Sequence, residues 1–269
     1  MPGTVGQTLD RFFSAYLECD LTRVTPGRVL IIPSNRREIP ELHYENPFAL
    51  WLVATGNRCI ISVQPALETP LKKLIARMPL PIFHLPEGRR MILETVARAL
   101  NLPGRVSAFS GPILFATRGT FRPVELHPCR QITTADIPVL QTAGLYDTCL
   151  DRSIAEGTCY AAFDGPDPVS LAGTREVPHL QDRIAEMYVP GTIPAKRREG
   201  YGKTCLSSAT RAVIQSGRIP LYLTSDLNPG SIATARAVGY QPYGRQFRVE
   251  IATAEPPPST TPLPQSPIF

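Results

Sequence analysis

The segment from Asp182 to Thr224 constrains the fold more than any other part of this chain. Asp182–Val189 predicts a strand, and Lys203–Gln215 has the apolar spacing of a helix that turns Leu206 and its neighbours inward. Gly217 stands where this helix should stop, and Ile219–Thr224 predicts a second, buried strand. A strand, a turn with two glycines, a helix and a strand in this order favour an α/β fold.

The chain before this segment also predicts mixed α and β structure. A turn at Asn101–Arg105 marks a boundary that we place near residue 104. We therefore predict an N-terminal α/β domain at 1–104, a second domain at 105–252, and a proline-rich, disordered tail at 253–269. Helices are expected at Thr8–Cys19, Glu68–Ala76 and Arg89–Leu100, and strands at Arg28–Ile32, Leu50–Ala54, Cys59–Val63, Gly111–Ala116, Cys159–Phe163, Val169–Ala172 and Gln246–Ile251.

Composition predicts a soluble, cytoplasmic protein. The 269 residues are 43% hydrophobic, which is enough for a buried core. We read no secretory leader and no apolar run long enough to span a bilayer, so no membrane partner is expected. The cysteines form no CxxC pair and the histidines lie far apart in the sequence, so no metal site is expected either.

Positive charge gathers in one part of the sequence. Residues 189–250 hold nine basic and three acidic residues, an excess of six, whereas the whole chain carries a net charge of +5. This local excess predicts a phosphate-bearing ligand at that end of the molecule. A solvated basic face would give the same pattern.

The run Thr192–Gly202 lies between the predicted strand and the predicted helix, and it contains Arg197-x-x-Gly200-x-Gly202. Two glycines let the backbone turn tightly, so that free N–H groups point outward where the helix dipole is positive. This arrangement predicts a pyrophosphate cradle. The alternative is a plain strand-to-helix turn.

A second motif begins 26 residues after Gly202, where Asn228-x-x-Ser231 is followed by Gly239-Tyr240. The two motifs, separated by one helix and one strand, together resemble the GNAT acyltransferase superfamily over Ile132–Glu250. The resemblance implies a twisted mixed β-sheet with flanking helices, preceded here by the smaller N-terminal domain. It also implies that the strands on either side of the helix splay apart to admit the pantetheine arm of acetyl-CoA. The donor-binding residues it implies are Val189, Thr192, Arg197, Arg198, Glu199, Gly200, Tyr201, Gly202, Lys203, Asn228 and Ser231.

The resemblance further implies direct attack of an amine on the thioester, with no covalent enzyme intermediate. Glu186 is the expected general base, because it lies on the strand that should border the thioester, and Ser231 is the other expected catalytic residue. An exposed carboxylate on an alternating strand is the alternative interpretation of Glu186. Asp182 and Tyr188 are weaker candidates on the same face.

Two positions depart from the family pattern. Ala235 stands where many members carry a tyrosine that protonates the leaving thiolate, so a different acid, or water, must serve. Pro190 has no backbone N–H where the strand usually offers one, so either the strand bulges there or the acyl group is held differently.

The sequence thus predicts an acyltransferase that moves an acyl group, most simply acetyl, from coenzyme A to the amine of a small molecule. An aminoacyl-tRNA donor is an alternative, since its phosphates would also suit the basic stretch. A non-catalytic module that binds CoA is a third interpretation.

Overall fold

A computed structural model describes residues 4–77 and 85–252, so the predicted disordered tail at 253–269 lies outside the described residues. The chain divides into two compact units. Of the described residues, the first unit holds those up to Gly111 together with 243–252, and the second holds Pro112–Pro242. Two strands change unit along their length, namely β4 (Val106–Phe115) and β10 (Gln241–Ile251).

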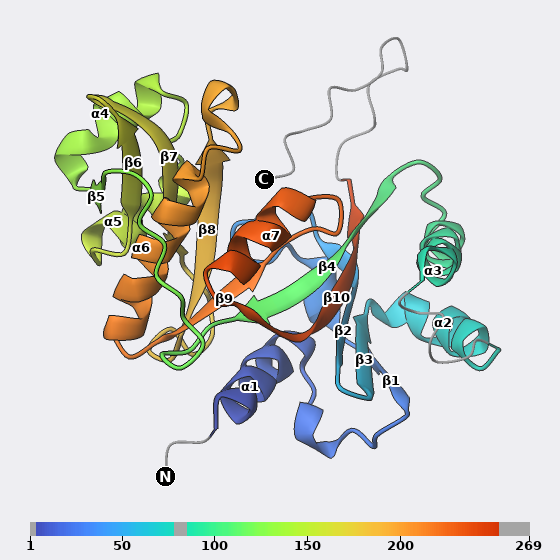
Figure 1. Ribbon diagram of the computed structural model, residues 1–269. Coiled ribbons are helices and arrows are strands. Elements are labelled where there is room, and N and C mark those ends of the chain that lie inside the picture. Colours follow the sequence, from blue (N-terminus) through green and yellow to red (C-terminus); the bar gives the residue numbers. More distant parts are fainter. Residues whose placement is uncertain (1–3, 78–84, 253–269) are drawn as a thin grey trace. The chain divides into compact units, whose positions relative to one another are not determined.

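The first unit places strands in the order β1-β3-β2-β10, with β1 and β3 parallel and the other neighbours antiparallel (Figure 1). Its two faces are built differently. On one face, Leu52 and Ile61 pack with Leu71 of α2 and Val96 of α3. The ring of Tyr16, which belongs to α1, packs against the ring of Trp51 of β2. The elements are α1 (Val5–Leu17), η1 (Leu21–Arg23), β1 (Val29–Pro33), η2 (Asn35–Glu38), β2 (Phe48–Thr55), β3 (Arg58–Val63), η3 (Pro65–Leu67), α2 (Glu68–Ile75) and α3 (Pro86–Ala99).

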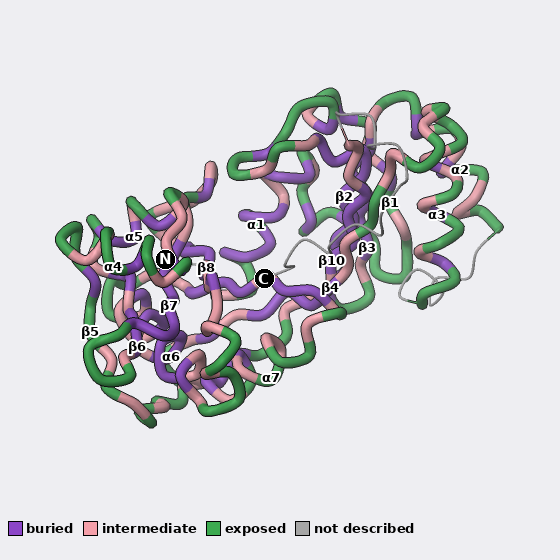
Figure 2. The backbone as a smooth tube through the Cα atoms, turned by 90° about the horizontal axis from the view of Figure 1, so that it is seen from above, coloured by how far each residue is buried: buried purple, intermediate pink, exposed green. Residues whose placement is uncertain are grey.

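Most of the last strand, from Tyr243 to Ile251, belongs to the first unit, although the sequence prediction placed Gln246–Ile251 in the second domain. Cross-strand pairing explains the difference. Phe247 lies opposite Leu52 on β2, and Phe247 and Val249 are both buried in the core of the first unit. Strand β2 is buried along its whole length, as its purple trace in Figure 2 shows. The strand from the end of the chain therefore completes a core that the N-terminal residues begin.

The second unit places strands in the order β4-β9-β8-β7-β6-β5. The strands predicted at Cys159–Phe163 and Val169–Ala172 form a hairpin, because β6 and β7 pair antiparallel across Asp164–Asp167. The elements are β5 (Cys129–Gln131), η5 (Thr134–Asp136), α4 (Ile137–Thr142), η6 (Thr148–Leu150), α5 (Asp151–Ala155), β6 (Tyr160–Asp164), β7 (Asp167–Arg175), β8 (Ile184–Thr192), η7 (Pro194–Lys196), α6 (Tyr201–Gln215), β9 (Ile219–Leu223) and α7 (Pro229–Ala237).

Helices cover both faces of the sheet in the second unit. Alternation along β6 separates the two cores, because Ala162 packs with Leu206 and Val213 of α6 while Ala161 packs with Leu140 of α4 on the opposite face. Figure 1 shows α6 running across β6, β7 and β8. The predicted α/β class, with a twisted mixed sheet and flanking helices, is confirmed.

Strands β8 and β9 diverge partway along β8. They run parallel and pair from Ile184↔Ile219 to Glu186↔Leu221, yet β8 continues to Thr192. On its other side β8 stays paired with β7, where Tyr188 lies opposite Gly173 and Gly191 lies opposite Leu171. One β7 residue thus faces both Val189 and Pro190, so β8 bulges at the proline, the first of the two outcomes predicted. On the other side of β8, the edge beyond Glu186 is unpaired because β9 no longer runs beside it.

Among the described residues, no helix combines the length and the apolar character that crossing a lipid bilayer requires.

Candidate functional site: a cavity at the splayed strands

A cavity of about 740 Å³ lies within the second unit, at the stretch of β8 that no longer pairs with β9. Its volume falls in the range of small-molecule and cofactor sites, roughly 300–1,000 Å³. Three elements supply its walls: the end of β8, the loop that leads into α6, and the start of α7. Its lining residues are Val189, Pro190, Gly191, Thr192, Lys196, Arg197, Arg198, Gly200, Tyr201, Gly202, Lys203, Tyr222, Leu227, Asn228, Gly230, Ser231, Ala233 and Thr234.

The N-terminus of α6 faces this cavity without a side-chain cap. The helix has 15 residues, and its N-cap residue is Gly200, so no side chain accepts from the first-turn N–H groups. These N–H groups and the positive end of the helix dipole form an anion site in principle. Arg198, two residues earlier, has a φ of 67°, a conformation that non-glycine residues adopt at an energetic cost. The loop is therefore held in a defined, strained shape beside the cavity.

Both predicted glycines have a steric reason to be glycine. Gly200 has a φ of 99°, and a Cβ there would stand 2.6 Å from a methyl carbon of Leu126. A Cβ on Gly202 would stand 3.2 Å from the hydroxyl of Thr192, which itself lines the cavity. A side chain at either position would therefore disturb the turn that leads into α6.

Positive charge is concentrated at the cavity rather than spread evenly. Four of the nine basic residues between positions 189 and 250 line it: Lys196, Arg197, Arg198 and Lys203. Of these four, Lys196 is itself paired with Asp164 at 2.5 Å. Two of the other five are paired at the surface, since Arg211 binds Glu125 and Arg218 binds Glu156. Arg248 is 6% exposed and its guanidinium lies over aromatic rings of the first unit. The basic stretch is therefore not one continuous solvated face. Its residues at the cavity make the cavity the favoured place for an anionic ligand.

The start of α7 supplies a second set of polar groups. Asn228 caps the helix, because its Oδ1 accepts from the backbone N–H of Ser231 at 3.0 Å. The Ser231 hydroxyl in turn accepts from Thr224 Oγ1 at 2.7 Å and lies 2.9 Å from the Tyr222 hydroxyl. These contacts fix the orientation of Ser231 at the cavity wall.

The structure brings ten of the eleven predicted donor-binding residues to this one cavity. The exception is Glu199, which does not line it. The backbone oxygen of Glu199 instead contacts His127 Nε2 at 2.8 Å, and the His127 ring stacks on Tyr201 with 3.6 Å between centroids. Glu199 therefore helps to hold the loop against the segment that precedes β5.

The predicted base, Glu186, does not line the cavity, although it lies on β8 where the gap between β8 and β9 begins. It is 6% exposed, it occupies the last β8 position that pairs with β9, and its carboxylate is bound to Arg175 on the neighbouring strand. Its neighbours Ala185 and Met187 face α6, so the Glu186 side chain points to the opposite face of the sheet. The prediction of an exposed carboxylate on an alternating strand is thus wrong in its exposure, because the ion pair with Arg175 holds the side chain inside.

The weaker base candidates are also accounted for. The Tyr188 hydroxyl donates to Asp147 at 2.8 Å, and burial together with that carboxylate raises the pKa of Tyr188 above its ordinary value. Asp182 precedes β8, which begins at Ile184.

Sequence reasoning missed Tyr222 as a site residue. It is the fourth of the five residues of β9, and an aromatic residue in a short apolar run is typical of a core position. Its ring does pack in the core, with Ala235 and Tyr240, but Tyr222 also lines the cavity and its hydroxyl meets Ser231. The only local signal would have been a polar atom in a strand whose other residues have none.

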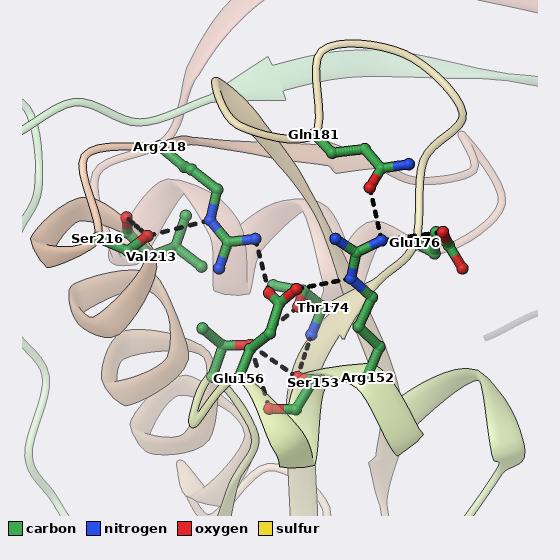
Figure 3. Close-up of polar contacts among 10 residues, drawn as sticks. Arg152, Ser153, Glu156, Thr174, Glu176, Gln181, Val213, Ser216 and Arg218 are labelled. Carbon is green, nitrogen blue, oxygen red and sulfur yellow. Dashed lines mark hydrogen bonds and ion pairs between the residues drawn. The ribbon is translucent and has the colours of Figure 1, made fainter.

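A second polar cluster of the second unit satisfies itself. Figure 3 shows Arg152 and Arg218 converging on Glu156, with Nε–Oε1 and Nη1–Oε2 distances of 2.6 and 2.8 Å. Arg152 also reaches Glu176 and Gln181. Opposite charges and hydrogen bonds balance here, so the cluster joins α5 to the strand β9 rather than offering a ligand site. Among residues 4–77 and 85–252, no three His, Cys, Asp or Glu side chains gather as metal ligands would.

No protein-family model matches the chain, and no curated protein matches it. Several solved structures are similar to it. A GCN5-related N-acetyltransferase from Kribbella flavida is 16% identical over 76% of this chain and 90% of its own, with a TM-score of 0.48. An acetyltransferase from the GNAT family of Colwellia psychrerythraea is 13% identical over 71% of this chain and 76% of its own, with a TM-score of 0.46. A tandem GNAT protein from the clavulanic acid biosynthesis pathway is 13% identical over 60% and 59%, with a TM-score of 0.40.

The structures similar to this chain thus include the family that its sequence motifs resemble. At 13–16% identity each of these is a likeness of fold alone.

Proposed function

We propose that the cavity binds a coenzyme A thioester and that the protein transfers the acyl group to the amine of a small molecule. One observation carries the proposal: an unpaired edge of β8 leads directly to the uncapped N-terminus of α6, with four basic side chains around it. Coenzyme A has the matching sequence of groups, because two amides of its pantetheine arm precede a pyrophosphate. An extended chain with amides suits an open strand edge, and a pyrophosphate suits a helix N-terminus.

The residues divide by the part of the donor that they would hold. Backbone groups of β8 from Val189 to Thr192 would bind the pantetheine amides, and Asn228 with Ser231 would face the arm from α7. The pyrophosphate would lie against the N–H groups of Tyr201–Lys203. Arginine forks and a lysine ammonium then add charge-assisted bonds to the phosphate oxygens, and these side chains are Lys196, Arg197, Arg198 and Lys203.

The acyl transfer would proceed by direct attack. The amine nitrogen bonds to the thioester carbon, the carbon–sulfur bond breaks, and the amine loses a proton while the sulfur gains one. Glu186 is the proposed acceptor of the amine proton, since it lies on β8 where the gap between the strands begins. Cys205 is not the nucleophile. It is fully buried, its thiol donates to the backbone oxygen of Ser170 at 3.2 Å, and burial raises the pKa of the thiol well above its ordinary value.

Calorimetric titration with CoA and acetyl-CoA tests the binding, and release of free thiol from acetyl-CoA in the presence of a panel of small primary amines tests the transfer. We expect saturable binding of both ligands and amine-dependent thiol release. No binding of either ligand to the folded protein would contradict the proposal. Binding without thiol release for any amine would leave the non-catalytic CoA module as the better description.

A further inference from the structure

Three hydroxyl groups form a connected chain at the wall of the cavity. Thr224 Oγ1 donates to Ser231 Oγ at 2.7 Å, and Ser231 Oγ lies 2.9 Å from the Tyr222 hydroxyl. Tyr222 and Ser231 line the cavity, whereas Thr224 is 3% exposed. The chain of hydroxyls therefore begins in the protein interior and ends at the ligand space.

The direction of these hydrogen bonds leaves a proton for the cavity. Because Ser231 Oγ already accepts from Thr224, the proton of Ser231 can be donated to Tyr222, and the phenolic O–H of Tyr222 is then left to donate outward. A phenol is the more acidic of the two hydroxyl types and hence the better hydrogen-bond donor. Burial raises the pKa of Tyr222 above its ordinary value, so this proton stays in place at neutral pH.

We propose that Tyr222 donates a hydrogen bond to the sulfur atom of the bound thioester and stabilises the thiolate as it leaves. This inference rests on the proposed function. When the amine attacks, the electron pair of the carbon–sulfur bond goes to sulfur, and a donor at that atom carries the developing negative charge. The chain of hydroxyls strengthens Tyr222 as a donor. As the phenolic proton is pulled toward sulfur, the Ser231 hydroxyl donates more strongly to the phenolic oxygen of Tyr222.

Tyr222 would take the role of the tyrosine that many members of the family carry at the position of Ala235. Ala235 is fully buried and packs in the same cluster as Tyr222, so it presents no polar group to the cavity. A donor that many members of the resembling family supply from the helix would here come from strand β9.

The test reads the acid strength of the CoA thiol in its complex, which requires no knowledge of the acceptor. Thiolate absorbs in the ultraviolet and thiol does not, so a pH titration of the CoA complex, with desulfo-CoA as the blank, gives the thiol pKa. A hydrogen bond donated to the thiolate favours the charged form and lowers that pKa. We expect the bound thiol of Tyr222→Phe to titrate at least about one pH unit higher than that of the wild type.

Tyr240→Phe is the matched control. Tyr240 is also buried, its hydroxyl lies 2.8 Å from the Thr210 hydroxyl, its ring is 5.5 Å from that of Tyr222, and it does not line the cavity. Loss of this hydroxyl should leave the thiol pKa at the wild-type value. Equal thiol pKa values in the wild type, Tyr222→Phe and Tyr240→Phe would overturn the inference while the proposed function stands.

The remaining outcomes also decide. If wild-type protein binds no CoA, the proposed function fails before the inference is reached. If Tyr222→Phe does not fold or does not bind CoA, Ser231→Ala replaces it, because loss of the supporting donor should raise the thiol pKa by a smaller but measurable amount. A Ser231→Ala complex that titrates like the wild type would then count against the hydroxyl chain.

Discussion

Glu186 and Arg175 lie directly opposite each other on β8 and β7, and the Glu186 carboxylate accepts from Arg175 Nη2 at 2.5 Å. The pair holds the carboxylate on the face of the sheet that α6 does not cover. A base in that position would meet an amine that approaches the thioester from this face.

If Glu186 is the base, Glu186→Gln should lower turnover about a hundredfold, leave CoA affinity unchanged, and shift the acidic limb of the pH–rate profile. Steady-state rates across pH give the turnover and the acidic limb, and calorimetry gives the CoA affinity. Arg175→Gln is the control, since it breaks the same ion pair but keeps the carboxylate, and it should retain most of the turnover. An equal loss in both variants would assign Glu186 a purely structural role.

The cradle at α6 predicts that Gly200→Val weakens CoA binding at least tenfold, about 1.4 kcal/mol. The added side chain would strain a backbone with a φ of 99°, a conformation that residues with a Cβ rarely adopt, so the start of α6 and its N–H groups would shift. Gly217→Val is the control, because Gly217 has a φ of 81° at the other end of the same helix with no atom near its Cβ position. CoA affinity equal in both variants, each shown to be folded, would remove the pyrophosphate assignment.

The two possible donors differ in how salt affects their binding. An aminoacyl-tRNA would engage many phosphates, and log affinity falls with log salt by about 0.7–0.9 for each. We expect Arg236→Glu combined with Arg245→Glu to change the acetyl-CoA Michaelis constant less than about threefold, since neither residue lines the cavity. RNA retention on filters over a salt series is the parallel measurement. A steep salt dependence that flattens in this double variant, without thiol release from acetyl-CoA, would favour the tRNA donor.

The cluster around Glu156 makes stability depend on pH. Burial alone would raise the pKa of Glu156, but hydrogen bonds from Arg152 and Arg218 outweigh it and hold the pKa below its ordinary value. The stabilisation is therefore present above the unfolded-state pKa of about 4.3 and is lost as the pH falls through the folded-state pKa. We expect Glu156→Gln to lower the free energy of unfolding by about 1 kcal/mol at neutral pH, and less below pH 4 or so. A difference in denaturant midpoint that is constant from neutral to acidic pH would contradict this assignment.

A close backbone approach predicts the strongest effect on stability. A Cβ on Gly239 would stand 2.0 Å from the carbonyl oxygen of Thr120, in a chain crossing that the hydrogen bond from Arg122 N to Val238 O holds at 2.8 Å. Gly239→Ala should therefore cost about 3 kcal/mol or more of unfolding free energy. Gly217→Ala meets no neighbouring atom and should cost only about 1 kcal/mol for its backbone conformation. Chemical denaturation of the two variants compares them, and equal losses would mean that the crossing can relax.

Local chemistry explains which parts of this molecule were predictable. Gly200 and Gly202 predict a tight turn before a helix, and Asn228 predicts a helix start, because each residue is needed for the backbone of its own segment. Contacts between separate helices and strands leave no such mark in the sequence. Phe247 pairs with β2 almost two hundred residues away, and Tyr222 reaches Ser231 only once β9 and α7 are folded together. The walls of the cavity were therefore predictable where they are made of turns, and not where they are made of tertiary contacts.

The cap of α7 gives the cavity a sense of direction. Asn228 turns its side-chain oxygen to the N–H of Ser231, so its amide nitrogen is the group left to meet a ligand. A ligand amide next to Asn228 can accept a hydrogen bond from its side-chain N–H when the ligand carbonyl faces α7. With the ligand N–H facing α7 instead, two donors would oppose each other. An analogue with that one amide bond reversed keeps its length, charge and apolar surface. The protein would distinguish this analogue from the parent compound only by the direction of that amide bond.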